Sequence, residues 1–204
     1  MNDFYYTPNP DVVHKIQQWD FELLGNKIAF TTDNGVFSKK RVDYGSVVLM
    51  NAFNISKIPS GKILDLGCGY GPVGIALAKK YTDREFDLVD VNNRALSLAQ
   101  TNAKNNGVDN RLTIYNSNIY ENIQSKYAAI VVNPPIRAGK MVVNTMLSKA
   151  KNHLLPSGTL TAVLQKKQGA PSAKKLMKST FGNCEIIKKD KGYYILESIY
   201  NGDK

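Results

Sequence analysis

The stretch "ILDLGCGYGPVGIALAKK", residues 63–80, places three glycines at alternate positions between an apolar run and a helix-like run. An apolar run followed at once by Gly67, Gly69 and Gly71 predicts a buried strand that turns sharply into a helix near Pro72. Such a turn lets backbone N–H groups approach a ligand closely at the carboxyl end of a strand. The G-x-G-x-G spacing differs from the G-x-G-x-x-G of dinucleotide sites, and a tight turn that binds nothing is the alternative.

The remaining sequence alternates between strand-like and helix-like segments. The expected strands cover 61–67, 85–91, 111–116, 127–135 and 158–165, and the expected helices cover 71–81, 93–107 and 141–155. This order predicts an α/β fold built on a mostly parallel sheet. Two further strand-like runs, "NCEIIKK" and "GYYILESIY", flank the turn-like Asp190-Lys191-Gly192 and predict an antiparallel C-terminal hairpin. The prediction is therefore a seven-stranded sheet.

A chain of 204 residues is long enough for one well-buried domain, so we expect a single domain over 1–204. An N-terminal extension, 1–60, with two short strands and a helix at 43–53, is expected to pack on a core at 61–204. No apolar run approaches the roughly 18 to 20 residues that span a bilayer. Two distant cysteines without CxxC spacing, and the lone histidines His14 and His153, favour a cytoplasmic protein with no metal and no membrane partner.

Positive charge is concentrated in the C-terminal third. From Arg137 onward there are thirteen Lys or Arg against four Asp or Glu, whereas residues 1–136 hold fourteen against thirteen. This asymmetry fits a polyanionic partner such as nucleic acid, and a lysine-rich solvated face is the alternative. The candidate nucleic-acid contacts are Arg137, Lys140, Lys166, Lys167, Lys174 and Lys175.

Two acidic residues lie where they could bind a ligand held by the glycine stretch. Asp90 ends the next expected strand about twenty residues after the glycines, where a carboxylate accepts hydrogen bonds from ribose hydroxyls. Asp65 lies two residues before Gly67, and we expect it to face an ammonium group through a water molecule. Together they predict a ligand that carries a ribose and a cationic amino-acid tail.

A second group of candidate residues ends the fourth strand of the alternation, in "VVNPPIRAGK" at 131–140. Asn133 offers an amide oxygen, and Pro134 and Pro135 remove two N–H donors and stiffen the chain. Two acceptors, the Asn133 amide and the Pro134 carbonyl, would then face one amine. Aspartate at 133 would retain the acceptor, so we expect Asn133→Asp to keep measurable activity. An Asn-Pro turn that merely ends a strand is the alternative.

In this order, "DLGCGYG", Asp90 and "NPPI" resemble class I S-adenosylmethionine-dependent methyltransferases that modify exocyclic amino groups. Nearly the whole chain, including "DNGVFSKKRVDYGS" at 33–46, resembles a short branch of the RsmC-like small-subunit ribosomal RNA guanine-N2 methyltransferases. The resemblance implies a Rossmann-like fold, S-adenosylmethionine as cofactor, and ribosomal RNA or the assembling small subunit as partner. We expect a monomer. It assigns cofactor contacts to Asp65, Gly67, Gly69, Gly71, Asp90, Val91, Asn118, Ile119 and Asn133, and the catalytic corner to Asn133, Pro134, Pro135 and Ile136.

The sequence departs from the family pattern at two positions. Asn118 stands where the family often has Asp, and Ile136 stands where many amino-methylating relatives have an aromatic that stacks on the target base. Because the aliphatic Ile136 does not stack on a base as an aromatic does, this motif does not distinguish guanine from adenine N6 or a protein glutamine as the target. A Rossmann oxidoreductase and a non-catalytic RNA-binding protein are the alternatives from other classes. We expect Cys68 to be a small filler, and Phe37 and Tyr44 either cover the cofactor or pack on the core.

Overall fold

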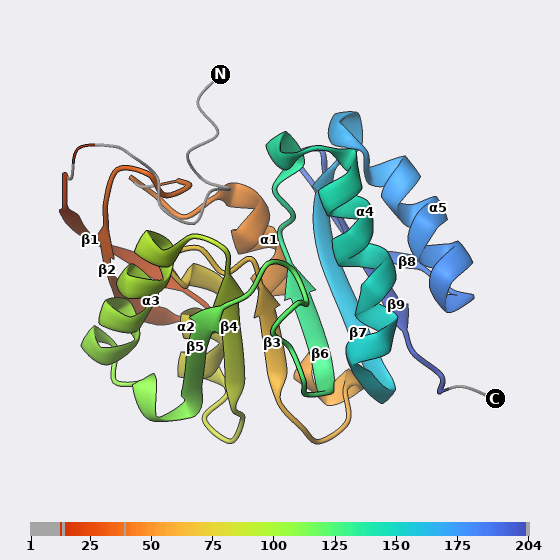
Figure 1. Ribbon diagram of the computed structural model, residues 1–204, viewed down its shortest axis with the longest axis horizontal. Coiled ribbons are helices and arrows are strands. Elements are labelled where there is room, and N and C mark those ends of the chain that lie inside the picture. The colour runs from red at the N-terminus through yellow and green to blue at the C-terminus, as the bar shows by residue number, and fades with distance from the viewer. Residues whose placement is uncertain (1–12, 14, 39, 203–204) are drawn as a thin grey trace.

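The computed structural model describes residues 13, 15–38 and 40–202, so His14 lies outside the described residues (Figure 1). The described chain forms a seven-stranded sheet in the order β5-β4-β3-β6-β7-β9-β8 and a separate two-stranded hairpin, β1-β2. The strands are β1 (Gln17–Leu23), β2 (Asn26–Thr32), β3 (Ile63–Leu66), β4 (Phe86–Asp90), β5 (Leu112–Asn116), β6 (Tyr127–Val132), β7 (Leu154–Gln165), β8 (Glu185–Asp190) and β9 (Tyr193–Ile199). The helices are α1 (Tyr44–Ala52), α2 (Pro72–Lys80), α3 (Asn93–Asn105), α4 (Lys140–Ser148) and α5 (Ala170–Phe181), joined by short helical turns η1 (Ile55–Lys57), η2 (Asp109–Arg111), η3 (Ile136–Ala138), η4 (Lys149–His153) and η5 (Lys166–Gln168).

The sheet is covered on both faces, and its strands are accordingly apolar. Alternate side chains of β3 point to opposite sides: Ile63 packs in the core with α1, α2 and α3, whereas Leu64 and Leu66 pack in the core with α4 and α5. The five strands β3 to β7 are parallel, and β9 runs antiparallel to both β7 and β8. The predicted Rossmann-like sheet with an antiparallel C-terminal hairpin is confirmed.

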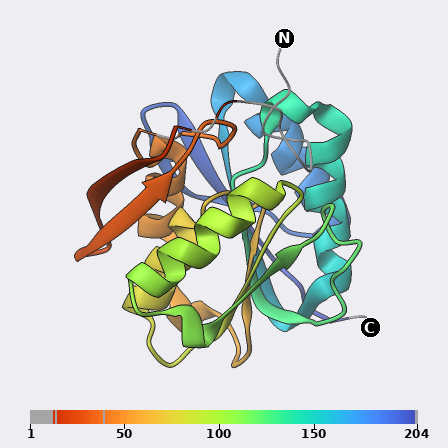
Figure 2. The same ribbon diagram turned by 60° about the vertical axis from the view of Figure 1, so that its left-hand side comes forward.

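The N-terminal hairpin packs beside α3 rather than joining the sheet (Figure 2). Two side-chain amides of α3 substitute for a neighbouring strand. Asn102 accepts from Thr31 N at 2.7 Å and donates to Thr31 O, and Asn106 accepts from Ala29 N at 3.0 Å and donates to Ala29 O. The edge of β2 thus has its backbone groups satisfied, and the extension is held against the core.

Two segments differ from the sequence prediction. The helix expected over 141–155 ends at Ser148, and after η4 the chain is already in β7 from Leu154. Helix α5 was not predicted, because its lysines obscure an apolar stripe. That stripe consists of Ala170, Ala173, Met177 and Phe181, which are buried against the sheet and α4. The predicted turn at 190–192 is confirmed, with Lys191 and Gly192 both at positive φ.

The described residues contain no helix that is both long and apolar enough to cross a membrane. Within the same residues, no group of three or more His, Cys, Asp or Glu side chains is placed to hold a metal ion. His153 stacks on the ring of Tyr120 with a centroid separation of 4.5 Å.

Candidate active site

A cavity of about 410 Å³ opens at the carboxyl ends of β3, β4 and β6. These are neighbouring strands of the parallel part of the sheet, so the segments that follow them meet at one edge. Residues from the start of α1, from η3 and from β9 complete the wall. The predicted glycine stretch and the predicted "NPPI" corner therefore line the same cavity.

The glycine turn is held open by backbone geometry. Gly67 and Gly69 have φ of +77° and +57°, in the left-handed region that favours glycine. A Cβ on Gly69 would meet nothing within 4 Å, so the space beside it belongs to the cavity. Gly71 has another function: it caps α2 just outside the cavity lining, and a Cβ there would lie 2.8 Å from Ile75 Cδ1.

Two predicted carboxylates point into this half of the cavity. Asp90 accepts hydrogen bonds from Gly69 N at 2.8 Å and Asn92 N at 2.9 Å, and burial raises its pKa. Asp65 is 3% exposed and accepts from Gly74 N at 2.8 Å. Burial raises the pKa of Asp65 to about 7. Burial also raises the pKa of the Cys68 thiol, which fits the expected filler and not a nucleophile.

Three more of the predicted cofactor contacts lie on the same side. Val91 follows β4, and Asn118 and Ile119 follow β5, and all three line the cavity. The Asn118 amide nitrogen donates to Glu121 Oε1 at 2.8 Å, so its oxygen is the group available as an acceptor. Ile119 has φ of +55°, which marks a tight turn at the cavity wall.

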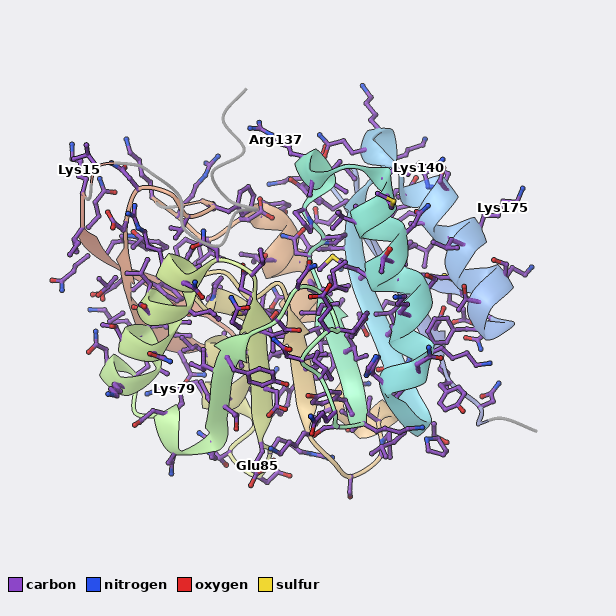
Figure 3. The ribbon with its side chains drawn as sticks, viewed as in Figure 1. Lys15, Lys79, Glu85, Arg137, Lys140 and Lys175 are labelled. Atoms are coloured by element: carbon purple, nitrogen blue, oxygen red, sulfur yellow. The ribbon has the colours of Figure 1, made fainter. Side chains whose placement is uncertain are left out.

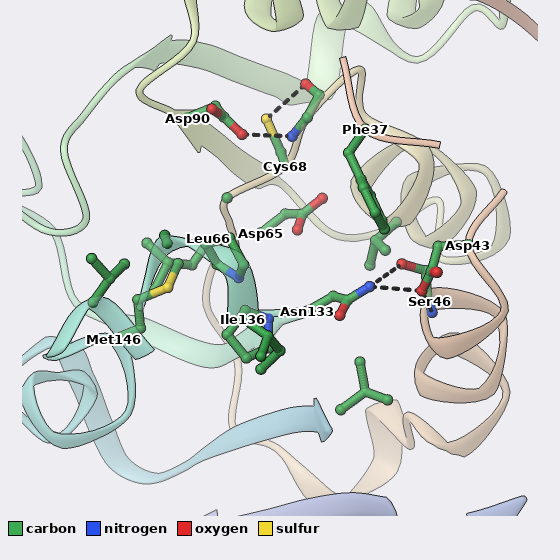
Figure 4. A pocket seen from close by; sticks show the side chains of 18 of the residues that line it. Phe37, Asp43, Ser46, Asp65, Leu66, Cys68, Asp90, Asn133, Ile136 and Met146 are labelled. Carbon is green, nitrogen blue, oxygen red and sulfur yellow. Dashed lines mark hydrogen bonds between the residues drawn. The ribbon is translucent and has the colours of Figure 1, made fainter. Parts of the chain in front are cut away.

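The "NPPI" corner forms the opposite wall. Asn133, Pro134, Pro135 and Ile136 all line the cavity, with Ile136 beginning η3. The Asn133 amide nitrogen donates to Asp43 Oδ2 at 3.0 Å and to the Ser46 hydroxyl at 2.9 Å. Figure 4 shows the amide oxygen directed away from both partners. The predicted acceptor therefore has a defined orientation.

Several cavity residues have no strong local signal in the sequence. Asp43 and Ser46 lie at the start of α1, and Tyr193 in β9 receives a hydrogen bond from Gln165 Nε2 at 2.7 Å. The only available signal for Asp43 was its position at the start of a helix-like run, where aspartate is a favoured N-cap. Phe37, one of the two aromatics left undecided, is 52% exposed and lines the cavity, whereas Tyr44 packs against Tyr193.

The predicted basic residues divide into two groups by position. Arg137 lines the cavity, and Lys140 begins α4 directly after η3; both project at that end of the molecule (Figure 3). Lys166 and Lys167 lie in η5, between two residues that line the cavity, Gln165 and Gln168. Lys174 and Lys175 lie farther along α5, and Figure 3 shows Lys175 pointing outward from that helix.

Charge inside the cavity differs in sign from charge at its rim. Three carboxyl groups, Asp43, Asp65 and Asp90, line the interior, together with the single cation Arg137 among the described lining residues. Such an interior favours a cationic ligand and disfavours the pyrophosphate of a dinucleotide. The exposed lysines outside favour a polyanion. The arrangement suits a cationic cofactor held inside and a nucleic acid held across the opening.

Comparison with known proteins agrees with this chemistry. Residues 27–197 match the family described as methyltransferase small domain. The uncharacterized protein YbxB of Bacillus subtilis is 45% identical over 200 residues, which cover 97% of this chain and 98% of YbxB. Ribosomal RNA small subunit methyltransferase C of Photorhabdus laumondii is 31% identical over 188 residues, covering 90% of this chain and 54% of the relative.

Among solved structures, a T. thermophilus 16S rRNA N2 methyltransferase, RsmC, in complex with AdoMet and guanosine, superposes with a TM-score of 0.82. It is 23% identical and covers 94% of this chain and 52% of the other. This likeness establishes the fold. The chain spans about half the length of the methyltransferase C relatives that it matches.

Proposed function

Because the chain belongs to the methyltransferase small domain family, as an RsmC-like class I S-adenosylmethionine-dependent methyltransferase, we propose that it methylates N2 of a guanine in small-subunit ribosomal RNA. The observation that carries the proposal is the placement of one oriented amide oxygen, that of Asn133, across a single cavity from the glycine turn. A cofactor at the turn and an amine at the amide would then meet inside that cavity.

The cavity residues fit this cofactor. S-adenosylmethionine supplies, when bound, an electrophilic methyl group on a positively charged sulfur. We assign the ribose hydroxyls to Asp90, the amino-acid tail to Asp65 and the backbone around Gly67 and Gly69, and the adenine to Val91, Asn118 and Ile119. Asp65 and Asp90 also provide the negative field that a cationic ligand requires. Gly71 supports this half indirectly, because only a residue without a side chain leaves room for Ile75 in the first turn of α2.

The opposite wall positions the amine. An exocyclic amine is a weak nucleophile because its lone pair is delocalised into the ring. The Asn133 oxygen and the Pro134 carbonyl would accept its two hydrogens and turn the lone pair toward the methyl group. Pro135 fixes the chain direction, and Ile136 packs on the base with an aliphatic face. Positioning carries most of the rate, because the amine loses its proton after methylation.

The substrate is proposed to reach the cavity as an unpaired or flipped nucleotide, at a cost of a few kcal/mol. Arg137, Lys140, Lys166 and Lys167 lie beside the opening and would contact the neighbouring phosphates. Lys174 and Lys175 on α5 would contact RNA farther from the flipped base. A ribosomal partner would place the protein in the cytoplasm, and we propose that it acts as a monomer.

We also propose that 1–60 and 61–204 work as one domain. The described part of the extension supplies Phe37, Asp43 and Ser46 to the cavity, and α1 packs on β7 and β9. The amine-binding wall would therefore be incomplete without it.

The test is the identity of the methylated product. Small-subunit RNA or subunits from cells that lack the protein are incubated with the protein and deuterated-methyl S-adenosylmethionine, and nucleosides are resolved by mass spectrometry. We expect the heavy methyl group in N2-methylguanosine, with Asn133→Ala as the matched inactive control. Heavy methyl label in N6-methyladenosine or in a protein glutamine would show that guanine N2 is not the target. Binding of NAD instead of S-adenosylmethionine, measured by calorimetry, would reject the methyltransferase assignment.

A further inference from the structure

The Asn133 side chain uses both of its amide hydrogens on acceptors from a distant part of the chain. Its nitrogen lies 3.0 Å from Asp43 Oδ2 and 2.9 Å from the Ser46 hydroxyl oxygen, at sequence separations of 90 and 87 residues. The reversed amide would place its oxygen against the Asp43 carboxylate, where two acceptors would repel each other. The oxygen is thereby held in the opposite direction, away from Asp43 and Ser46 (Figure 4), on a residue that lines the cavity.

Asp43 is itself fixed by its surroundings. It is the N-cap of α1, and its Oδ2 accepts from Ser46 N at 3.2 Å. Gly45 and Ser46 in the first turn of α1 are buried, and a Cβ at Gly45 would lie 2.8 Å from Tyr193 Cε1, so this part of the turn packs closely on β9. A carboxylate held by a helix start and a neighbouring strand is a rigid support for the amide.

We infer that Asp43 is a positioning residue that holds the Asn133 amide in one orientation and, through its negative charge, makes the amide oxygen a stronger acceptor for the target amine. When a carboxylate accepts a hydrogen bond from an amide N–H, its negative charge pushes electron density from the amide nitrogen toward the carbonyl oxygen, because linked hydrogen bonds polarise one another. The inference rests on the proposed function, since it names how that site is prepared.

The contact also changes one expectation. Aspartate at position 133 retains an acceptor, yet it would bring a second carboxyl group to within hydrogen-bond distance of Asp43. Two carboxylates at that separation cannot both ionise comfortably. We therefore expect Asn133→Asp to lose most transfer activity, and Asp43→Asn in the same chain to restore part of it by removing the repulsion.

A purely structural role for Asp43 can be separated from this one. Asp43→Asn keeps an oxygen for Ser46 N, and asparagine caps helices about as well as aspartate, so the fold is retained while the charge is lost. Asp109→Asn is the matched control, because Asp109 is exposed at the start of η2, away from the residues that line the cavity. Thermal unfolding of both variants checks that the fold is unchanged.

The first readout is the Asn133 side-chain amide in a ¹⁵N–¹H spectrum, assigned by its disappearance in Asn133→Ala. We expect its protons to shift upfield and to exchange faster with solvent in Asp43→Asn, but not in Asp109→Asn. The second readout is single-turnover methyl transfer to ribosomal RNA at saturating cofactor. We expect about a tenfold loss in Asp43→Asn, with cofactor affinity unchanged, and no further loss when the same change is added to Asn133→Ala.

The outcomes are distinguishable. A wild-type rate in Asp43→Asn, or an equal loss in the Asn133→Ala background, would overturn the inference while leaving the proposed function intact. If the wild-type protein methylates no guanine, the proposed function fails. The inference is judged separately by the spectrum: an Asn133 side-chain resonance that does not shift in Asp43→Asn would overturn it. Should Asp43→Asn not fold, the contact is judged by Asn133→Asp: full activity there would overturn it.

Discussion

The two halves of the cavity are built in different ways. The half around Gly67, Gly69 and Asp90, where we propose that the cofactor binds (the cofactor half), comes from short segments that follow neighbouring strands: the two glycines follow β3, and Asp90 ends the adjacent β4 and accepts a hydrogen bond from Gly69 N. The half around Asn133, where we propose that the amine binds (the amine half), is assembled from distant segments, because the Asn133 amide is oriented by residues of α1. One half thus depends on local backbone geometry, and the other depends on tertiary contacts between side chains.

This difference implies a division of function. Changes in the cofactor half should alter affinity for S-adenosylmethionine, whereas changes in the amine half should alter the rate of transfer.

The largest effect is expected for Asn133→Ala. Loss of one preorganised acceptor should lower the single-turnover rate by roughly 10²- to 10³-fold, by analogy with other transition-state hydrogen bonds. Cofactor affinity should remain near wild type in calorimetry. Asn110→Ala, at an exposed amide outside the cavity lining, is the control. An unchanged rate in Asn133→Ala would leave "NPPI" as a strand-ending turn.

Next in size is Asp90→Ala, which removes a charged acceptor from the proposed ribose site. We expect cofactor binding to weaken by about 1.5 to 3 kcal/mol, measured by calorimetry. Asp83→Ala, whose side chain is 79% exposed, removes the same charge away from the site. Equal affinities in the two variants would place the ribose elsewhere.

A smaller effect is expected from neutralising lysines at the rim. Lys166→Ala with Lys167→Ala should weaken RNA binding and flatten its salt dependence by up to about 0.7 to 0.9 in slope for each lost phosphate contact. The pair Lys174 and Lys175 should contribute less, because it lies farther along α5. Lys104 and Lys126, both exposed, are controls. If neither the η5 pair nor the α5 pair changes the salt dependence of RNA binding, these lysines only face solvent.

The smallest effect concerns Asp65. Since burial raises its pKa to about 7, ionisation over pH 6 to 8 should tighten binding of the cationic cofactor several-fold, and Asp65→Asn should lack this dependence. The folded-state pKa lies above the ordinary value of 3.8, so the stabilising contribution of this group is full below about pH 4 and is lost as the pH rises through 7. Titration calorimetry across this range, with denaturant melts alongside, measures both. A flat wild-type profile would contradict the assignment.

The sequence was sufficient to place Gly67, Gly69 and Asp90 beside one another at the ends of neighbouring strands, because the determinants of that placement are local. Glycine spacing, an acidic residue at the next strand end and the strand-helix alternation are each visible within a short window. It was sufficient to place Asn133 at a strand end, but not to orient its amide. The partner lies 90 residues away, and no local pattern in the sequence specifies which way an amide points. Helix α5 was missed for a related reason, since its buried stripe is interrupted by exposed lysines.

The separation of the two halves is tested most directly by single-turnover methyl transfer to ribosomal RNA as a function of S-adenosylmethionine concentration. Four proteins are compared: wild type, Asp90→Ala, Asn133→Ala and the double variant. We predict that Asp90→Ala raises only the half-saturating concentration, that Asn133→Ala lowers only the plateau rate, and that both changes add in the double variant within about 0.5 kcal/mol. A shift of both parameters by either single variant would contradict the account.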